Sequence, residues 1–265
     1  MNPTPQELKR GKLTKKKLEQ ALAEIDEEGY VLLERAVPTT LLKEIRDAMD
    51  SVHRQHFKAH PGATKNASSL GKGRGLFNVR PPKEMPFMDP LVVANPFVVQ
   101  ILEQVLGPDM FCASYNTNNS WPGSGVQHVH RDQDPLFENL LHPPSAVTVS
   151  IPLVPFTEQT GATEIWPETH LYTGPYPGDI PSFDSVAGDR ASCRMLAPWG
   201  SIVLRDGRMW HRGMPNKTKK VRTMLSLVYR RPFNARDQSM GIRQEVWNQI
   251  SERARQIFRF SPVND

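Results

Sequence analysis

Residues 222–229 read RTMLSLVY, and this run decides the fold class. Side chains of a β-strand point alternately to its two faces. On that spacing Arg222, Met224, Ser226 and Val228 share one face, while the other carries Thr223, Leu225, Leu227 and Tyr229. The run therefore predicts a β-strand.

Further short β-type runs surround this strand and are separated by proline and glycine. They cover residues 110–116, 146–154, 163–166 and 200–205, and the chain has 24 prolines in 265 residues. Many short strands with turn signals between them are typical of a sandwich or jelly roll rather than of a parallel sheet. The proline content also argues against a helix bundle, because proline interrupts helices.

The first hundred residues are predicted to be helical instead. Apolar spacing and end signals indicate helices over residues 14–29, from residue 38 onward and over 95–107, with a short strand at 30–33. Residues 61–90 are interpreted as a long loop, and residues 244–260 as a helix. No linker divides the chain, so we expect one domain: helical support and lid over 1–108, a β core over 109–232 and a C-terminal helix over 233–265.

Composition excludes several classes of protein. Hydrophobic residues make up 38% of the chain and charged residues 23%, which argues against a disordered chain or a coiled coil. No apolar run approaches the length of a membrane span, and the two cysteines lack CxxC spacing, so we expect a cytoplasmic protein without membrane contact. The net charge of +5 is concentrated in residues 9–17. A solubilising frayed terminus is favoured there over a nucleic-acid contact, since no aromatic residues accompany the charge.

Two separate segments carry the residue types of a metal site. His130 and Asp132 lie two apart in QHVHRD (residues 127–132), so a strand would point both to one side. A second segment, GSIVLRDGRMWHRG (residues 200–213), ends a strand and turn with His211. Two imidazoles and one carboxylate are typical of the Fe(II) site of non-haem oxygenases, which leaves three positions open for co-substrate and O2. Zinc more often has a fourth protein ligand or cysteine.

Arg222 follows His211 by eleven residues, at the start of the alternating strand. A guanidinium group near the metal can bind the distal carboxylate of a dicarboxylate through a pair of charged hydrogen bonds. Arg222 is therefore a candidate contact for a dicarboxylate.

The order of these elements resembles the phytanoyl-CoA dioxygenase-like branch of the Fe(II)/2-oxoglutarate-dependent oxygenases. The resemblance rests on His130-x-Asp132, His211 and Arg222, on GATEIWPETH (residues 161–170), on HRGMPN (211–216) and on EGYVL (28–32). It extends over roughly residues 15–232. The chain departs from the family pattern by Thr160 and Glu168, where asparagine and glycine are usual.

This resemblance implies a mainly β fold with flanking α-helices, a double-stranded β-helix of jelly-roll, cupin-like form. His130, Asp132 and His211 would be the catalytic metal ligands, and Arg222 would hold the C5 carboxylate of 2-oxoglutarate. Gln127 and Thr163 occupy the positions of two further co-substrate contacts in related members. Weaker candidates for the same pocket are Asn118 and Ser150, and Arg80 in the basic loop is a candidate contact for an anionic substrate.

The expected activity is oxidation of a small or medium organic substrate by Fe(II), 2-oxoglutarate and O2, with release of succinate and CO2. Halogenating relatives lack the carboxylate ligand, so Asp132 favours hydroxylation. A dioxygenase acting on nucleic acid or protein and a non-catalytic, metal-containing binding protein are the alternatives. Residues 61–90 and 174–189 are the predicted lids.

Overall fold

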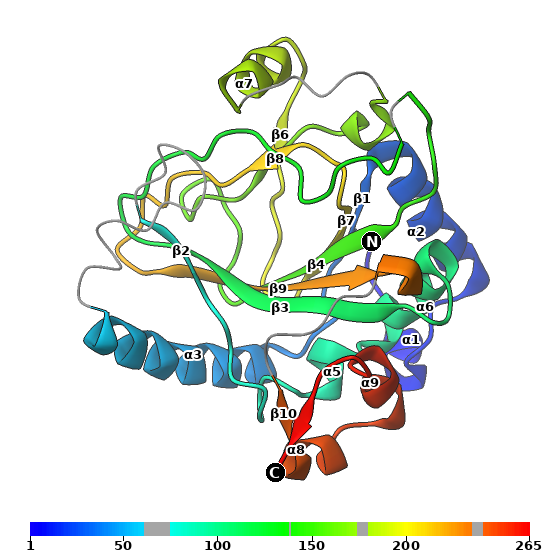
Figure 1. Ribbon diagram of the computed structural model, residues 1–265, viewed down its shortest axis with the longest axis vertical. Helices are drawn as coiled ribbons and strands as arrows, with labels where there is room; N and C mark the ends of the chain where they lie inside the picture. Colours follow the sequence, from blue (N-terminus) through cyan, green and yellow to red (C-terminus); the bar gives the residue numbers. More distant parts are fainter. Residues whose placement is uncertain (61–74, 138, 174–179, 235–240) are drawn as a thin grey trace.

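The computed structural model describes residues 1–60, 75–137, 139–173, 180–234 and 241–265, and its centre is an antiparallel sheet of six strands (Figure 1). In spatial order these strands are β1 (Tyr30–Leu33), β7 (Ile202–Asp206), β4 (Ala146–Pro152), β9 (Arg222–Arg230), β3 (Phe111–Ser120) and β2 (Leu76–Val79). A smaller sheet contains β6 (Cys193–Arg194), β5 (Glu164–Ile165) and β8 (His211–Arg212). Near the C-terminus β10 (Ile242–Arg243) and β11 (Val263–Asn264) form a parallel pair.

The two faces of the six-stranded sheet have different surroundings, as the alternation in β9 predicts. Leu225 and Leu227 belong to the core that the sheet shares with the helices, whereas Met224 belongs to a smaller core shared with Ile165 of the second sheet. The face that carries Met224 is called the inner face below. Because polar residues of β9 lie on it as well, a polar site is built between the two sheets.

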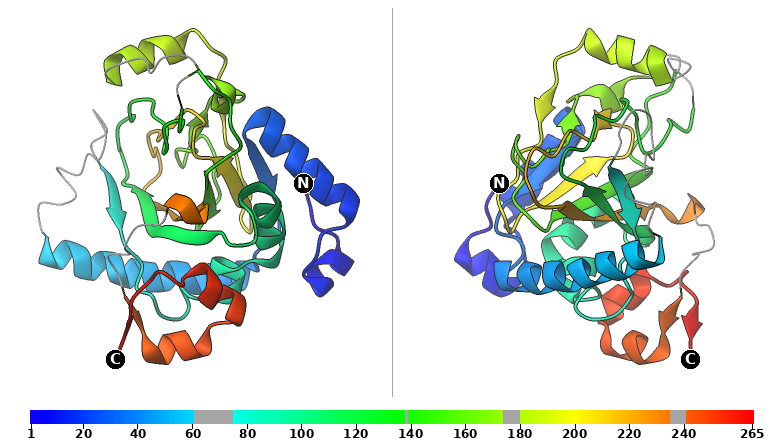
Figure 2. Two further views of the ribbon diagram at one scale, coloured as in Figure 1. Left: turned by 45° about the vertical axis from the view of Figure 1, so that its right-hand side comes forward. Right: turned by 90° about the vertical axis from the view of Figure 1, so that its left-hand side faces the viewer.

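Helices cover the opposite face of the sheet (Figure 2). They include α2 (Lys15–Glu28), α3 (Thr39–Ala59), α5 (Pro90–Val93) and α6 (Pro96–Leu106). Thr14 and Gly29 flank α2, and the Asn95 side chain caps α6 by accepting a hydrogen bond from the Phe97 backbone N–H at 3.1 Å. These ends agree with the helix signals in the sequence. Asn95 satisfies a backbone N–H of α6, and the Gly29 N–H donates to the Ile25 carbonyl at the end of α2, whereas the Thr14 side chain makes no capping hydrogen bond.

Three predictions differ from the structure. The N-terminus is not frayed: α1 (Pro5–Arg10) begins at a capping box of Thr4 and Glu7, and the Lys17 ammonium lies 2.7 Å from the Glu7 carboxylate. Strand β2 lies inside the predicted 61–90 loop, because its partner β3 stabilises a short run that lacks a long apolar pattern; residues 61–74 lie outside the described residues.

The C-terminal stretch is two short helices, α8 (Gln244–Gln249) and α9 (Glu252–Ile257), where one was predicted. Ser251 separates them, since its hydroxyl accepts a hydrogen bond from the Ala254 backbone N–H and begins a new helix.

The predicted second lid contains the helix α7 (Ile180–Gly188), and residues 174–179 lie outside the described residues. The remaining helical turns are η1 (Thr169–Leu171) and η2 (Pro232–Asn234). Among the helices that the structure describes, none combines the length and apolar character needed to cross a membrane.

Candidate metal centre

An antiparallel backbone bridge brings the two histidines together. The His130 N–H donates to the His211 carbonyl at 3.0 Å, and the His211 N–H donates back to the His130 carbonyl at 2.9 Å. Asp132 follows two residues later on the same side, and the potential ligand atoms of His130, Asp132 and His211 all lie within 4.8 Å of one another. Residues that are 81 apart along the chain thus offer their ligand atoms at one place.

Hydrogen bonds orient both imidazole rings. His130 Nδ1 lies 3.0 Å from the His128 carbonyl, and His211 Nδ1 lies 3.2 Å from the Met209 carbonyl. Because a carbonyl oxygen only accepts, the contact of His130 favours a proton on its Nδ1 and leaves its Nε2 as the potential ligand atom. His211 Nδ1 also lies 3.0 Å from Arg205 Nη1, which only donates, so the contacts of His211 favour neither tautomer. Burial lowers the pKa of His130, and burial together with the charge of Arg205 lowers the pKa of His211 well below its ordinary value. Both rings are therefore neutral at neutral pH, as metal ligands must be.

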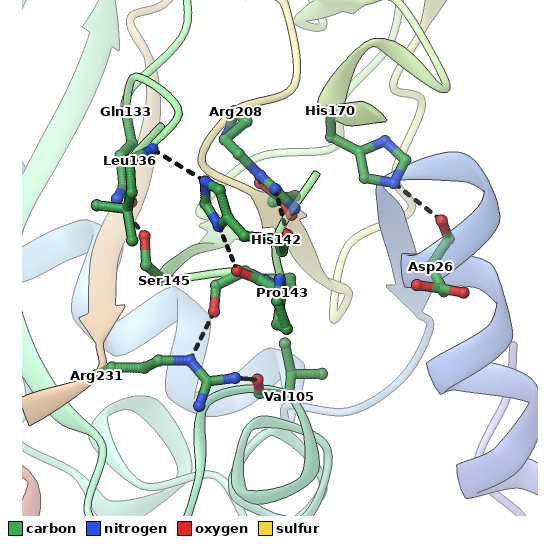
Figure 3. A network of polar contacts seen from close by, with 12 residues as sticks. Asp26, Val105, Gln133, Leu136, His142, Pro143, Ser145, His170, Arg208 and Arg231 are labelled. Atoms are coloured by element: carbon green, nitrogen blue, oxygen red, sulfur yellow. Dashed lines mark hydrogen bonds and ion pairs between the residues drawn. The ribbon is translucent and has the colours of Figure 1, made fainter. Parts of the chain in front are cut away.

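Asp132 is held ionised at the same place. Its desolvation in the cavity raises the pKa, but the neighbouring charge of Arg205 outweighs this effect and holds the pKa well below its usual range. Arginine side chains also hold two backbone carbonyls in the segment that leads from Asp132 to β4. Arg208 Nη1 donates to the His142 carbonyl at 2.6 Å (Figure 3). Arg231 Nε donates to the Pro144 carbonyl at 2.8 Å.

Arg222 lies buried at the start of β9, with 3% of its surface exposed. Its Nη1 lies 3.5 Å from the Asn118 carbonyl and its Nη2 lies 3.2 Å from the Gly161 carbonyl, while its Nε has no hydrogen-bond partner among the described residues. Burial lowers the pKa of Arg222 to about 10, so the group remains charged at neutral pH. A buried, incompletely paired guanidinium is suited to an incoming carboxylate.

The cavity between the sheets has a volume of about 470 Å³, which is within the range of small-molecule sites. Besides the three potential ligands and Arg222, it is lined by the predicted residues Gln127, Thr163, Asn118 and Ser150. Arg80 is exposed beyond the end of β2 and does not line this cavity. The structure therefore brings the predicted residues together with the exception of Arg80.

Comparison with known proteins decides the family, because residues 25–224 match the family of phytanoyl-CoA dioxygenase (PhyH). The chain belongs to the phytanoyl-CoA dioxygenase family. The dioxygenase trt7 of Aspergillus terreus is 23% identical over 224 residues, which cover 78% of this chain and 71% of that protein. The multifunctional dioxygenase ausE of Penicillium brasilianum is 27% identical over 149 residues, which cover 52% of this chain and 48% of that protein.

Solved structures show the same fold. The carbocyclase SnoK from nogalamycin biosynthesis, described as non-haem and α-ketoglutarate dependent, superposes with a TM-score of 0.62 at 19% identity, covering 83% of this chain and 84% of that one. The epimerase SnoN in complex with Fe3+, α-ketoglutarate and nogalamycin RO gives a TM-score of 0.61 at 18% identity, covering 84% and 89%. The predicted jelly roll is thereby confirmed. As a phytanoyl-CoA dioxygenase family member, the chain is an oxygenase.

The residues of this family member fit a ferrous ion with 2-oxoglutarate. Two neutral imidazoles and one carboxylate are the donor set that iron(II) oxygenases use, and none of the three is a thiolate that would favour zinc. The orphaned Nε of the buried Arg222 fits a carboxylate of the co-substrate.

Two residues of the site were not predicted. Arg205 of β7 lies 5% exposed, and its guanidinium contacts both Asp132 and His211. Its signal in the sequence is a lone arginine within the apolar run IVLRD, at an inward-facing strand position.

Asp184 of α7 is the second, and it holds the segment that directly precedes His130. Its carboxylate contacts His128 Nδ1 and accepts the Val129 backbone N–H at 2.7 Å. Phe183 of the same helix packs edge-on against Trp210 at a centroid distance of 4.7 Å. His128 is thus structural: its ring contacts Asp184, although spacing by two residues alone would place it on the side of His130. Helix α7 therefore braces the residues that precede both histidine ligands.

Proposed function

We propose that the protein is an Fe(II)- and 2-oxoglutarate-dependent dioxygenase that hydroxylates, or otherwise oxidises, an unactivated C–H bond of a small or medium organic substrate. His130, Asp132 and His211 would hold the iron, and Arg222 would hold the C5 carboxylate of 2-oxoglutarate, with Gln127 and Thr163 beside it. The observation that carries this proposal is the position of a buried, underpaired arginine in the same cavity as the three potential metal ligands.

When bound, iron with 2-oxoglutarate and O2 supplies the oxidising power for C–H cleavage, and the co-substrate leaves as succinate and CO2. The chain's own residues position these groups. Arg222 binds and orients the dicarboxylate, because its charge is buried where water does not screen it. Thr163 and Gln127 line the same cavity. Gln127 Oε1 accepts the Gly213 N–H at 2.7 Å, which fixes the turn after His211.

The presence of Asp132 favours hydroxylation over halogenation, since the carboxylate occupies a ligand position that a halide would need. The cavity volume supports a small-molecule substrate rather than a polymer.

An anaerobic titration tests the proposal. Wild-type protein with Fe(II) and 2-oxoglutarate should show the weak visible charge-transfer band of a chelated 2-oxoacid. The band should be lost in His211→Ala and Arg222→Leu and retained in His142→Ala, whose histidine lies on the exposed loop. Absence of the band in wild type, or its survival in both site variants, would contradict the proposal. Succinate release under O2 across classes of metabolites would then identify the substrate.

A further inference from the structure

Arg205 occupies a position that the proposed mechanism does not use. It points from β7 to the inner face of the sheet, in register with Thr148 of β4. Its Nη2 lies 2.5 Å from Asp132 Oδ2 and 3.2 Å from His211 Nε2, and its Nη1 donates to the Met209 carbonyl at 3.3 Å. A permanently charged group is therefore in contact with two of the three potential metal ligands.

The two oxygens of Asp132 have different surroundings because of this contact. Oδ2 accepts hydrogen bonds from Arg205 Nη2 and from the Thr148 hydroxyl, the latter at 3.0 Å. Oδ1 faces His211 Nε2 at 3.5 Å. Two donors on one oxygen fix the rotation of the carboxylate, so that Oδ1 is the oxygen presented beside the imidazole.

The charge of Arg205 also changes the balance of the site. A ferrous ion, one aspartate, the 2-oxoglutarate dianion and Arg222 would together sum to zero, and Arg205 adds one positive charge. A cation in contact with the ligands opposes the binding of a metal cation and favours that of an anion, because charges interact strongly where water is excluded. The two effects act in opposite directions on the metal and on the co-substrate.

We propose that Arg205 is a positioning residue that holds Asp132 Oδ2. Its charge weakens the binding of the metal and strengthens the binding of the co-substrate. With Thr148, Arg205 keeps Oδ2 out of the coordination sphere, which leaves a position open for 2-oxoglutarate. The claim that Arg205 strengthens 2-oxoglutarate binding rests on the proposed function, whereas the claim about metal binding does not. A purely structural role for Arg205 predicts a different outcome, since loosening the core would weaken both ligands together.

Redox-stable Mn(II) allows the affinity for the metal and the affinity for 2-oxoglutarate to be measured without turnover. Free Mn(II) is followed by electron paramagnetic resonance during titration of the full chain, and 2-oxoglutarate is then titrated calorimetrically onto Mn(II)-saturated protein. Arg205→Met should lower the Kd for Mn(II) by about tenfold or more and raise the Kd for 2-oxoglutarate by about tenfold or more, since removal of a contacting charge changes both in these directions.

Two further variants separate charge from hydrogen bonding. Arg205→Gln removes the charge and keeps a donor, so it should also tighten Mn(II) binding, and it serves if the methionine variant fails to fold. Thr148→Val removes one hydrogen bond to Oδ2 without a change of charge. It should leave the Kd for Mn(II) within about twofold and raise the Kd for 2-oxoglutarate by about threefold, the size of one ordinary hydrogen bond.

Weaker Mn(II) binding in Arg205→Met or Arg205→Gln would overturn the proposal, as would 2-oxoglutarate binding that is unchanged in both. If wild-type protein binds Mn(II) but no 2-oxoglutarate, the proposed function fails. The comparison of Mn(II) affinities then still decides whether Arg205 opposes the metal.

Discussion

Replacement of Arg222 by methionine should stabilise the protein in the absence of co-substrate. No carboxylate among the described residues lies within 4.0 Å of the Arg222 guanidinium, whose hydrogen bonds go to two backbone carbonyls. A buried charge without a counter-ion destabilises the folded state, and an apolar side chain of similar length removes that penalty.

The pKa gives the magnitude of the penalty. Burial lowers the pKa of Arg222 from 12.5 to about 10, which corresponds to about 3 kcal/mol at 1.36 kcal/mol per unit. Because a cation whose folded pKa is lowered is disfavoured at every pH below that value, the full penalty acts at neutral pH. The variant loses the contact of the guanidinium with the Phe156 ring at 5.3 Å and the two long hydrogen bonds to backbone carbonyls, which together contribute about 1–2 kcal/mol. The net gain is about 1–2 kcal/mol, or roughly 2 to 8 °C in Tm.

Thermal unfolding with and without 2-oxoglutarate, in the presence of Mn(II), measures this prediction. Wild-type protein should gain about 2–3 kcal/mol at a co-substrate concentration of about 100 times Kd, and Arg222→Met should gain nothing. Arg208→Met is the matched control, because the buried Arg208 is paired with Asp206 at 2.7 Å. That variant should lose about 3–5 kcal/mol, since it leaves a buried carboxylate alone. An Arg222→Met protein that melts below wild type without co-substrate would refute the reasoning, and so would one that 2-oxoglutarate still stabilises.

Three more perturbations test the surroundings of the site. Asp184→Asn weakens the hydrogen bond between residue 184 and His128. Chemical denaturation should show that the free energy of unfolding decreases by about 1–2 kcal/mol, and the Kd for Mn(II) should rise severalfold. Burial lowers the pKa of His53 to about 4, so stability is full above pH 6.5 and falls as pH decreases. Urea unfolding at pH 6.5 and 5 should differ by about 2 kcal/mol more in wild type than in His53→Leu. In Gly213→Ala the added Cβ would lie 2.5 Å from Gln127 Oε1, so the amide must move, and the Kd for 2-oxoglutarate should rise several-fold while that for Mn(II) changes less.

Local signals in the sequence predict much of this fold. Thr14, Gly29 and Asn95 mark helix ends that the structure reproduces, because a cap acts within one helical turn. The alternation in β9 predicts both faces of its strand. Strand β2 was missed since it depends on β3, and the break at Ser251 was missed although a serine followed by an acidic residue is a helix-start signal.

The residues of the candidate site likewise divide into those that local signals in the sequence predict and those that they do not. His130, Asp132, His211 and Arg222 could be predicted from residue type and spacing, since metal and dicarboxylate chemistry restricts the side chains that serve it. Arg205 could not, because an arginine in an apolar strand run has no defined partner until the register places it beside Thr148. The contact between α7 and His128 likewise joins segments 56 residues apart, and nothing in either segment specifies the other.

The buried arginines give the two ends of the cavity different electrostatic states. Arg205 is already balanced by Asp132, so the metal end is electrostatically satisfied in the free protein. Arg222 donates hydrogen bonds only to carbonyl groups among the described residues, so the co-substrate end keeps an uncompensated positive charge. A dianion that binds there removes the free-energy penalty of the uncompensated Arg222 charge, which is larger than the penalty at the metal end. Co-substrate should therefore contribute more to the stability of the loaded protein than its few contacts suggest, and the metal should contribute less.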